Sequence, residues 1–132
     1  MSNQSNPRIQ LNSDTSGDID EPSLEELEQL VLRLNGKDCS DIILYRTTDE
    51  ATSSLVICGG VDGRVTAILQ MDEDESFLHL CDVKGGSAEF EQSIGGVATP
   101  LPIKYCVDKR LALQAARTFF EFGIPDSALH WE

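Results

Sequence analysis

Residues 102–132 read PIKYCVDKRLALQAARTFFEFGIPDSALHWE, and they hold the clearest helix signal in the chain. Asp108 predicts the start of this helix, because its short side chain can accept hydrogen bonds from the free backbone N–H groups of a first turn. Apolar residues then recur at spacings of four, four and three, at Leu111, Ala115, Phe119 and Phe122. This spacing places them on one side of a 3.6-residue spiral. We therefore expect a helix that docks on a core along this stripe.

The end of the same stretch predicts a helix stop and an anchored tail. Gly123 can adopt the left-handed conformation that closes a helix, and Pro125 prevents its continuation. Beyond this stop lies Trp131, the single tryptophan of the chain. A large aromatic side chain can hold a chain end that would otherwise fray. We expect Phe119 and Trp131 to be structural anchors, and the alternative for Trp131 is an anchor at an interface with a partner.

The composition is typical of a globular domain with an acidic surface. The chain has 132 residues, of which 40% are hydrophobic and 25% charged, and this length is enough to bury a core. Its 23 acidic and 10 basic residues give a net charge of −13. Such a surface disfavours direct binding to nucleic acids or anionic membranes, because both require basic groups. The charge favours a basic protein partner, and the alternative is that it serves solubility alone.

The cysteines and histidines predict neither a disulfide framework nor a metal site. The four cysteines form no C-x-x-C pair, and each lies in or beside an apolar run: Cys39, Cys58, Cys81 and Cys106. A free thiol in such a run behaves as a small hydrophobic group, and two histidines supply no zinc-ligand spacing. No signal peptide is recognisable, and the apolar runs are shorter than the roughly 18 residues of a membrane span. We expect reduced thiols, no metal and no cofactor in a cytoplasmic protein.

The N-terminal part of the chain predicts a leader followed by a helix. Residues 1–21 contain few apolar side chains to offset the entropy of ordering, so we expect a flexible polar leader. A single folded domain is expected over residues 22–132. Ser23 and Glu26 match a capping box, in which each side chain satisfies a backbone donor of the first helical turn. Asn35-Gly36 marks the end of this helix.

Strand-favouring runs fill the middle of the chain. They cover residues 41–47, 55–58, 64–71, 77–83 and 88–94, with a strand or an extended lead into the last helix at 103–107. Asp62-Gly63 is a turn dipeptide, so the strands on its two sides should form an antiparallel hairpin. Glycine pairs and prolines interrupt residues 84–102. We expect an α+β fold with an antiparallel sheet of about four to six strands and with the N-terminal and C-terminal helices packed on one face.

Seven acidic residues are the candidate partner-binding residues. They are Asp62, Asp72, Glu73, Asp74, Glu75, Glu89 and Glu91. Four of them are consecutive, and because like charges repel one another, these four should project into water or toward a partner. A solvated turn is the alternative interpretation of the consecutive acids.

The chain carries no recognisable catalytic signature. GGVDG at residues 59–63 lacks the lysine and the spacing of a phosphate-binding loop and lies between strands, so its glycines are expected to be turn residues. His79 lies within an expected strand. His130 is close to Glu132 in the sequence, but no nucleophile is paired with it at a recognisable spacing. We therefore expect a protein without catalytic residues.

Three segments together resemble immunity protein family 1 of bacterial polymorphic toxin systems. They are ICGGVDG at residues 57–63, LPIKYCVDKRLALQAARTFFEFG at residues 101–123 and IPDSALHWE at residues 124–132. The positions that look like those of the family are Ala112, Ala116, Phe119, Phe120, Gly123, Pro125, Trp131 and Glu132. The resemblance is looser through the strands, and the leader lies outside it.

This resemblance implies a non-enzymatic inhibitor. Members of the family are encoded beside toxins, often toxins with nucleic-acid deaminase domains, and protect the producing cell by binding the toxin. The expected partner is therefore a cognate toxin domain, bound one to one, with no direct contact to nucleic acid or membrane. Two alternatives from other classes are an acidic interaction module or secretion chaperone without toxin-neutralising activity, and a small enzyme with an unrecognised active site.

Overall fold

The computed structural model describes residues 7–49, 51–71 and 77–132. Within these ranges the chain forms strands and two helices, which confirms the predicted α+β class. The strands are β1 (Arg8–Ser13), β2 (Gly17–Asp20), β3 (Asp41–Thr47), β4 (Thr52–Gly59), β5 (Arg64–Gln70), β6 (Leu78–Cys81), β7 (Glu89–Ile94), β8 (Val97–Pro102), β9 (Val107–Asp108) and β10 (His130–Trp131). The helices are α1 (Leu24–Arg33) and α2 (Lys109–Phe122), and two single 3-10 turns are η1 (Val61–Gly63) and η2 (Ile103–Tyr105).

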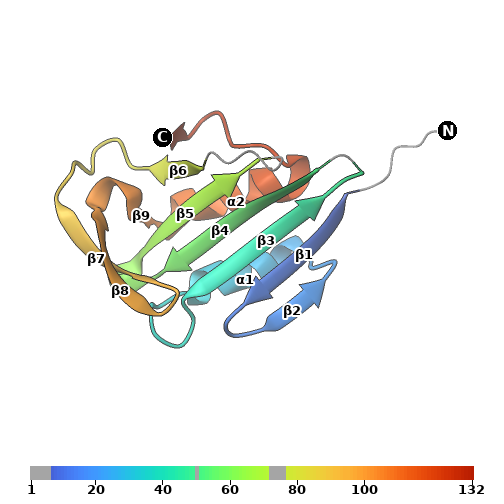
Figure 1. Ribbon diagram of the computed structural model, residues 1–132, viewed down its shortest axis with the longest axis horizontal. Coiled ribbons are helices and arrows are strands. Elements are labelled where there is room, and N and C mark those ends of the chain that lie inside the picture. The colour runs from blue at the N-terminus through green and yellow to red at the C-terminus, as the bar shows by residue number, and fades with distance from the viewer. Residues whose placement is uncertain (1–6, 50, 72–76) are drawn as a thin grey trace.

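One large antiparallel sheet organises the molecule (Figure 1). Within the described ranges it has eight strands in the order β10-β6-β5-β4-β3-β1-β2, with β9 paired to β5, and β7 and β8 form a separate hairpin. The predicted sheet of four to six strands is therefore too small. The unpredicted members are β1 and β2 at the N-terminus and the two-residue strand β10, which is too short to give a periodic signal. Strand β9 overlaps the strand or extended lead expected at residues 103–107 only at Val107. The predicted hairpin of β4 and β5 is confirmed.

The N-terminal segment belongs to the sheet, so the predicted flexible leader over residues 1–21 is wrong for residues 8–20. Strand β1 lies between β2 and β3 and pairs with both. Its sequence Ile9-Gln10-Leu11-Asn12 alternates apolar and polar side chains, and Leu11 is only 1% exposed. One row of side chains is thus buried while the other faces outward. Backbone pairing on both sides and this buried row stabilise a segment whose overall composition is polar.

Helix α1 begins where the capping box predicts. The Ser23 hydroxyl accepts a hydrogen bond from the backbone N–H of Glu26 at 3.0 Å, and the Glu26 carboxylate accepts one from the N–H of Ser23 at 2.8 Å. The side chains buried along and just after the helix are Leu27, Leu30, Val31 and Leu34. The β4–β5 turn packs against the end of this helix. At Gly60, where φ is 112°, a Cβ would lie 2.5 Å from the backbone of Leu34, so only glycine permits this approach.

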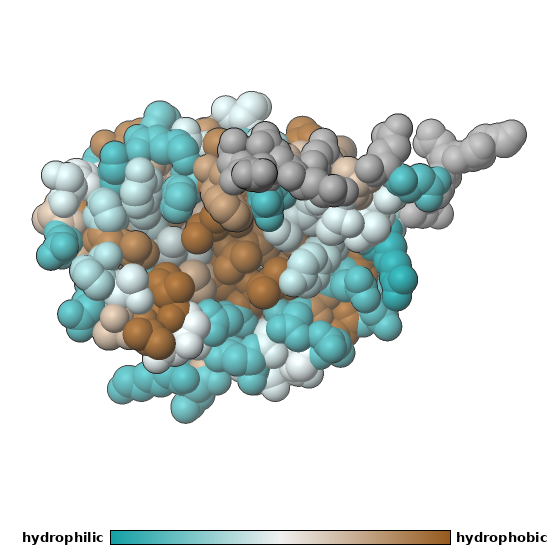
Figure 2. All heavy atoms as spheres, viewed as in Figure 1, coloured by the Kyte–Doolittle hydropathy of each residue, from teal (hydrophilic) through white to brown (hydrophobic). Residues whose placement is uncertain are grey.

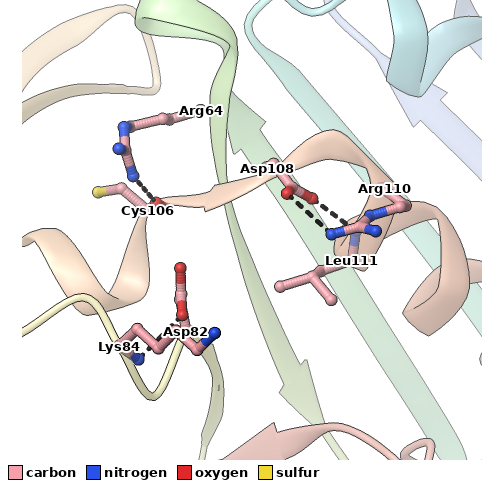
Figure 3. A network of polar contacts seen from close by, with 7 residues as sticks. All are labelled: Arg64, Asp82, Lys84, Cys106, Asp108, Arg110 and Leu111. Carbon is pink, nitrogen blue, oxygen red and sulfur yellow. Dashed lines mark hydrogen bonds and ion pairs between the residues drawn. The ribbon is translucent and has the colours of Figure 1, made fainter.

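Helix α2 begins and ends as predicted. The Asp108 carboxylate accepts a hydrogen bond from the N–H of Leu111 at 3.1 Å (Figure 3), and Gly123 closes the helix with a φ of 71°. The residues that the helix buries are Ala112, Ala115, Ala116 and Phe119. Phe122 is 63% exposed, so its assignment to the docking stripe is wrong. At about 100° per residue, Phe122 lies about 70° away from the centre of the buried stripe.

Residues 97–102 form a strand although prolines and glycines predicted an interrupted segment. Strand β8 pairs with β7 from Val97, opposite Ile94, to Pro102, opposite Glu89. In a two-stranded hairpin each strand has a free edge, so Pro100 and Pro102 can lack N–H groups on that edge without breaking the ladder. Residues 103–107, expected as a strand or an extended lead, form η2 and the start of β9.

Among the described residues, both helices pack on one face of the sheet, and no helix covers the other face. In Figure 1 both helices lie behind the sheet, and the strands face the viewer. The sheet residues that join the helices in the core are Leu11, Ile42, Leu44, Leu55, Ile57, Val65, Ala67, Leu69 and Leu80. We call the side of the sheet that faces away from the helices the open face.

Candidate functional site

The open face carries a row of apolar side chains at its centre. Ile43, Val56 and Ile68 lie opposite one another on the neighbouring strands β3, β4 and β5. Each alternates with core residues along its strand and is itself half-buried, so the three side chains point away from the helices. Figure 2 shows this face, with a hydrophobic area in a hollow near its centre and hydrophilic residues around it. We call these three residues the apolar row.

The β7–β8 hairpin covers one end of the open face. Gln92 of β7 is fully buried, and its amide nitrogen donates to the carbonyl of Arg64 at 3.0 Å and to the hydroxyl of Thr66 at 3.3 Å. Its amide oxygen accepts hydrogen bonds from the N–H groups of Val61 at 3.4 Å and Ser93 at 3.2 Å. This buried amide holds the hairpin against the sheet, beside the part of β5 that contributes to the apolar row.

The edge of the open face formed by β1 and β2 is acidic. A hollow of about 270 Å³ lies there. Exposed Asp18 and Asp20 line it, and their carboxylates accept hydrogen bonds from the amides of Asn12 at 2.6 Å and Gln10 at 3.0 Å. Tyr45, which is 37% exposed, lines the same hollow. Carboxylates that retain free lone pairs beside an aromatic ring can receive a basic side chain from a partner.

Three of the predicted partner-binding residues lie together at the hairpin end of the molecule. Glu89 and Glu91 are exposed on β7, and Asp62 is exposed in η1. The hydrogen bond between Val61 and Gln92 joins these two elements next to the acids. The other four predicted residues, Asp72, Glu73, Asp74 and Glu75, lie outside the described residues.

Most basic side chains are engaged within the protein. Of the ten basic residues, seven form an ion pair or a side-chain hydrogen bond with another described residue: Arg8, Arg46, Arg64, Lys104, Lys109, Arg110 and Arg117. Two of these contacts appear in Figure 3, where Arg64 donates to the carbonyl of Cys106 and Arg110 pairs with Asp108. The acids outnumber the bases, so the surface keeps an excess of negative charge that internal pairing does not remove.

A second cluster of polar side chains lies where β10 pairs with β6, and we call it the tail cluster. One oxygen of the Glu132 carboxylate accepts hydrogen bonds from the Lys104 ammonium at 2.9 Å and from the Tyr105 hydroxyl at 3.0 Å. Its other oxygen lies 3.3 Å from the His130 Nε2 atom. Cys81 is opposite His130 in the strand register and is 4% exposed. These residues come from three separate parts of the chain.

Charge and burial shift the titration of the tail cluster. Hydrogen bonds from Lys104 and then Tyr105 lower the pKa of Glu132 to about 2. Burial, followed by the negative charge of Glu132, raises the pKa of the Cys81 thiol to about 11. The thiol is therefore protonated at neutral pH and is a poor nucleophile in this state. The ring of His79 lies beside that of Tyr105, with 5.0 Å between the ring centroids and a tilt of 35° between the ring planes.

The two residues expected to be structural anchors occupy different environments. Phe119 is 1% exposed and lies in the core between helix and sheet. Trp131 is half-buried against the edge of that core, and its indole N–H donates to the carbonyl of Asp126 at 3.1 Å. The carboxylate of Asp126 in turn accepts a hydrogen bond from Thr118 of α2 at 2.7 Å. The tail is thus fixed to both the helix and the sheet.

Sequence reasoning missed the apolar row, the acidic edge and the tail cluster. The row was hidden because residues 41–47 and 64–71 have apolar side chains on both faces, as strands covered on both sides do. A signal for the acidic edge was present in the alternation of β1, which predicts one outward polar row. For the tail cluster the sequence shows only that His130 is close to Glu132, because the approach of Cys81 depends on the pairing of β10 with β6.

A comparison with protein family models finds no match to the chain, and a comparison with curated proteins finds no match either. Among the described residues, neither helix is long and apolar enough to cross a lipid bilayer. The candidate site therefore rests on the geometry and charge of the open face.

Proposed function

We propose that the protein is an immunity protein, which binds a cognate toxin through the open face of its sheet and inhibits it without chemistry of its own. The observation that carries this proposal is the apolar row, which is half-buried on the side of the sheet that faces away from the helices, on a face where Figure 2 shows a hydrophobic area with hydrophilic residues around it. An apolar centre with a polar rim is the usual anatomy of a protein–protein interface. Ile43, Val56 and Ile68 would be the central contacts that exclude water.

The charge of the surface supports a basic partner. Asp18 and Asp20 border the open face on one side, and Glu89 and Glu91 are exposed on the hairpin at its end. A toxin that deaminates nucleic acid needs a basic groove around its catalytic pocket, because it must hold phosphates. An acidic inhibitor can occupy that groove, and opposite charges accelerate the encounter. The resemblance to immunity protein family 1 supports such a toxin as the partner, bound in the cytoplasm of the producing cell.

The test is binding to the toxin domain encoded beside this protein. Titration calorimetry at two salt concentrations measures stoichiometry and affinity, and a deaminase assay measures inhibition. We expect a one-to-one complex that abolishes toxin activity and weakens as salt rises, because exposed charges are screened. An affinity indifferent to salt would remove the electrostatic part of the proposal.

A pair of matched substitutions locates the interface. Val56→Arg places a long cation at the centre of the apolar row, and we expect affinity to fall by about 30-fold or more, the effect of losing a central contact of ~2 kcal/mol. Leu32→Arg makes the same change on α1, where the side chain is 51% exposed, and should alter affinity by no more than about twofold. Equal affinity of the two variants would exclude the open face as the binding surface.

A double substitution separates the role of the acidic edge from that of the apolar row. Asp18→Lys with Asp20→Lys should slow association and reduce its dependence on salt, while leaving dissociation nearly unchanged. An unchanged association rate would place the acidic edge outside the interface. Lack of binding by the unaltered protein to the toxin domain would overturn the proposed function itself.

A further inference from the structure

Three different metal-ligating side chains meet in the tail cluster. The sulfur of Cys81, a ring nitrogen of His130 and a carboxylate oxygen of Glu132 all lie within 4.8 Å of one another. In a tetrahedral zinc site, metal–ligand bonds of about 2.0–2.3 Å place the ligand atoms about 3.3–3.7 Å apart. Side-chain rotations that move the ligand atoms by about an ångström would therefore bring these three groups into coordination distance of one ion. Cys81 is held by β6 and His130 by the paired strand β10, so two of the ligands already have fixed backbone positions.

The chemistry of these ligands selects the class of ion. Thiolate and imidazole are ligands of borderline and soft transition metals, whereas magnesium and calcium prefer sites made of oxygen alone. A mixture of sulfur, nitrogen and oxygen ligands is typical of zinc. Three protein ligands leave one tetrahedral position for water. His130 and Glu132 are half-exposed at their side chains, at 50% and 38%, which leaves that position accessible from solvent.

The surrounding hydrogen bonds orient the carboxylate for such a role. Lys104 and Tyr105 both bind the Oε1 atom of Glu132, while the Oε2 atom faces the Nε2 atom of His130. One oxygen is therefore fixed by neighbours, and the other is directed toward the remaining ligands. Ligating carboxylates in metal sites are commonly held by hydrogen bonds in this way.

We propose that Cys81, His130 and Glu132 form a binding site for a divalent transition metal of the zinc class. On binding, the Cys81 thiol loses its proton to the buffer and its thiolate coordinates the ion. His130 coordinates through Nε2 as the neutral imidazole with its proton on Nδ1, and Glu132 coordinates through Oε2. The bound ion would join β6 to β10 and so fasten the tail to the sheet. This site is separate from the apolar row and does not depend on the proposed toxin partner.

The test uses cobalt as a spectroscopic probe for zinc. The metal-free full chain is titrated with Co²⁺, and absorption is followed in the visible range and in the near ultraviolet, where thiolate-to-cobalt charge transfer appears. We expect saturation at one equivalent, a charge-transfer band, and displacement of the cobalt by Zn²⁺. Calorimetry with Zn²⁺ in two buffers of different ionisation enthalpy should show release of about one proton per ion, as thiol deprotonation requires.

Matched variants decide whether these residues are the ligands. Cys81→Ser should abolish the charge-transfer band, and Cys39→Ser, which changes a thiol of equal 4% exposure on the helical side, should preserve it. His130→Asn and Glu132→Gln change exposed side chains and keep the test valid if Cys81→Ser misfolds. Each should weaken Co²⁺ binding at least about tenfold. Absence of one-equivalent binding by the unaltered protein, or binding that all three variants retain, would overturn the proposal.

Discussion

Gln92 is predicted to hold the β7–β8 hairpin on the open face, and Gln92→Ala should remove that attachment. The residue is 0% exposed and makes four hydrogen bonds at 3.0–3.4 Å to β5, η1 and its own strand. Each such bond contributes about 0.5–1.5 kcal/mol, and a buried group left without a partner costs about 1–3 kcal/mol. Because the bond to Val61 is long, we expect the free energy of unfolding to fall by about 3 kcal/mol.

Urea denaturation measures this loss, and amide hydrogen exchange locates it. The N–H groups of Val61 and Ser93 lose their acceptor in Gln92→Ala, so their exchange should accelerate more than that of β3 and β4. Gln29→Ala, an exposed change of the same type on α1, should stay within about 0.5 kcal/mol of the unaltered protein. A loss below about 1 kcal/mol in Gln92→Ala, with exchange in β7 unchanged, would refute the attachment of the hairpin by this amide.

Three further predictions concern the tail and the β4–β5 turn. Trp131→Ala should lower the free energy of unfolding by about 2 kcal/mol, roughly half the cost of deleting a fully buried tryptophan, because the Trp131 side chain is half-buried. Calorimetric melting measures this loss, and a loss near zero would show that the tail is not anchored. Gly60→Ala should lower the free energy of unfolding, measured by urea denaturation, by about 2 kcal/mol or more. The loss should exceed that of Gly86→Ala, because both residues have a positive φ but only Gly60 of the two has backbone atoms where a Cβ would lie. Equal losses would refute the steric argument. Glu132→Gln should lower the melting temperature near pH 6, but much less near pH 2.5. The pKa of Glu132 is about 2 in the folded protein and about 4.3 in the unfolded chain. The ionised carboxylate therefore stabilises the fold fully above the unfolded pKa, and this stabilisation disappears as the pH falls through the folded pKa. A difference that persists unchanged to pH 2 would mean that the carboxylate charge is not its cause.

The start of α1 and the end of α2 could be predicted from the sequence because their signals are local. Ser23 and Glu26 satisfy donors within one turn of their own positions, and Gly123 closes the helix that it follows. Such contacts form whatever the rest of the fold does. The position of Phe122 could not be predicted in the same way, because a stripe of apolar residues has a width and only the tertiary contact decides where its edge falls.

Strand errors came from rules that depend on where a strand lies in a sheet. Pro100 and Pro102 argue against a central strand but are compatible with a two-stranded hairpin, as β8 shows. The polar segment over residues 8–20 argues against a buried element but is compatible with strands that bury one side only, as β1 does. In both cases the residues are compatible with either a strand or an irregular segment, and pairing with a neighbouring strand decides which of the two forms.

The same dependence explains why the candidate site is mostly invisible in the sequence. In DIILYRT of β3, Ile42 and Leu44 enter the core while Ile43 faces outward, although all three side chains are of similar hydrophobicity. If another layer covered the open face, Ile43 would be a second core residue, and no functional inference would follow. Within the part of the chain that the structure describes, the β7–β8 hairpin, held by Gln92, covers one end of this face, and Ile43, Val56 and Ile68 lie half-buried on the same face. Apolar side chains that lie together on a surface often mark a site where another molecule binds. The pattern that resembles a double-sided core strand in the sequence is therefore, in this fold, an argument for a partner.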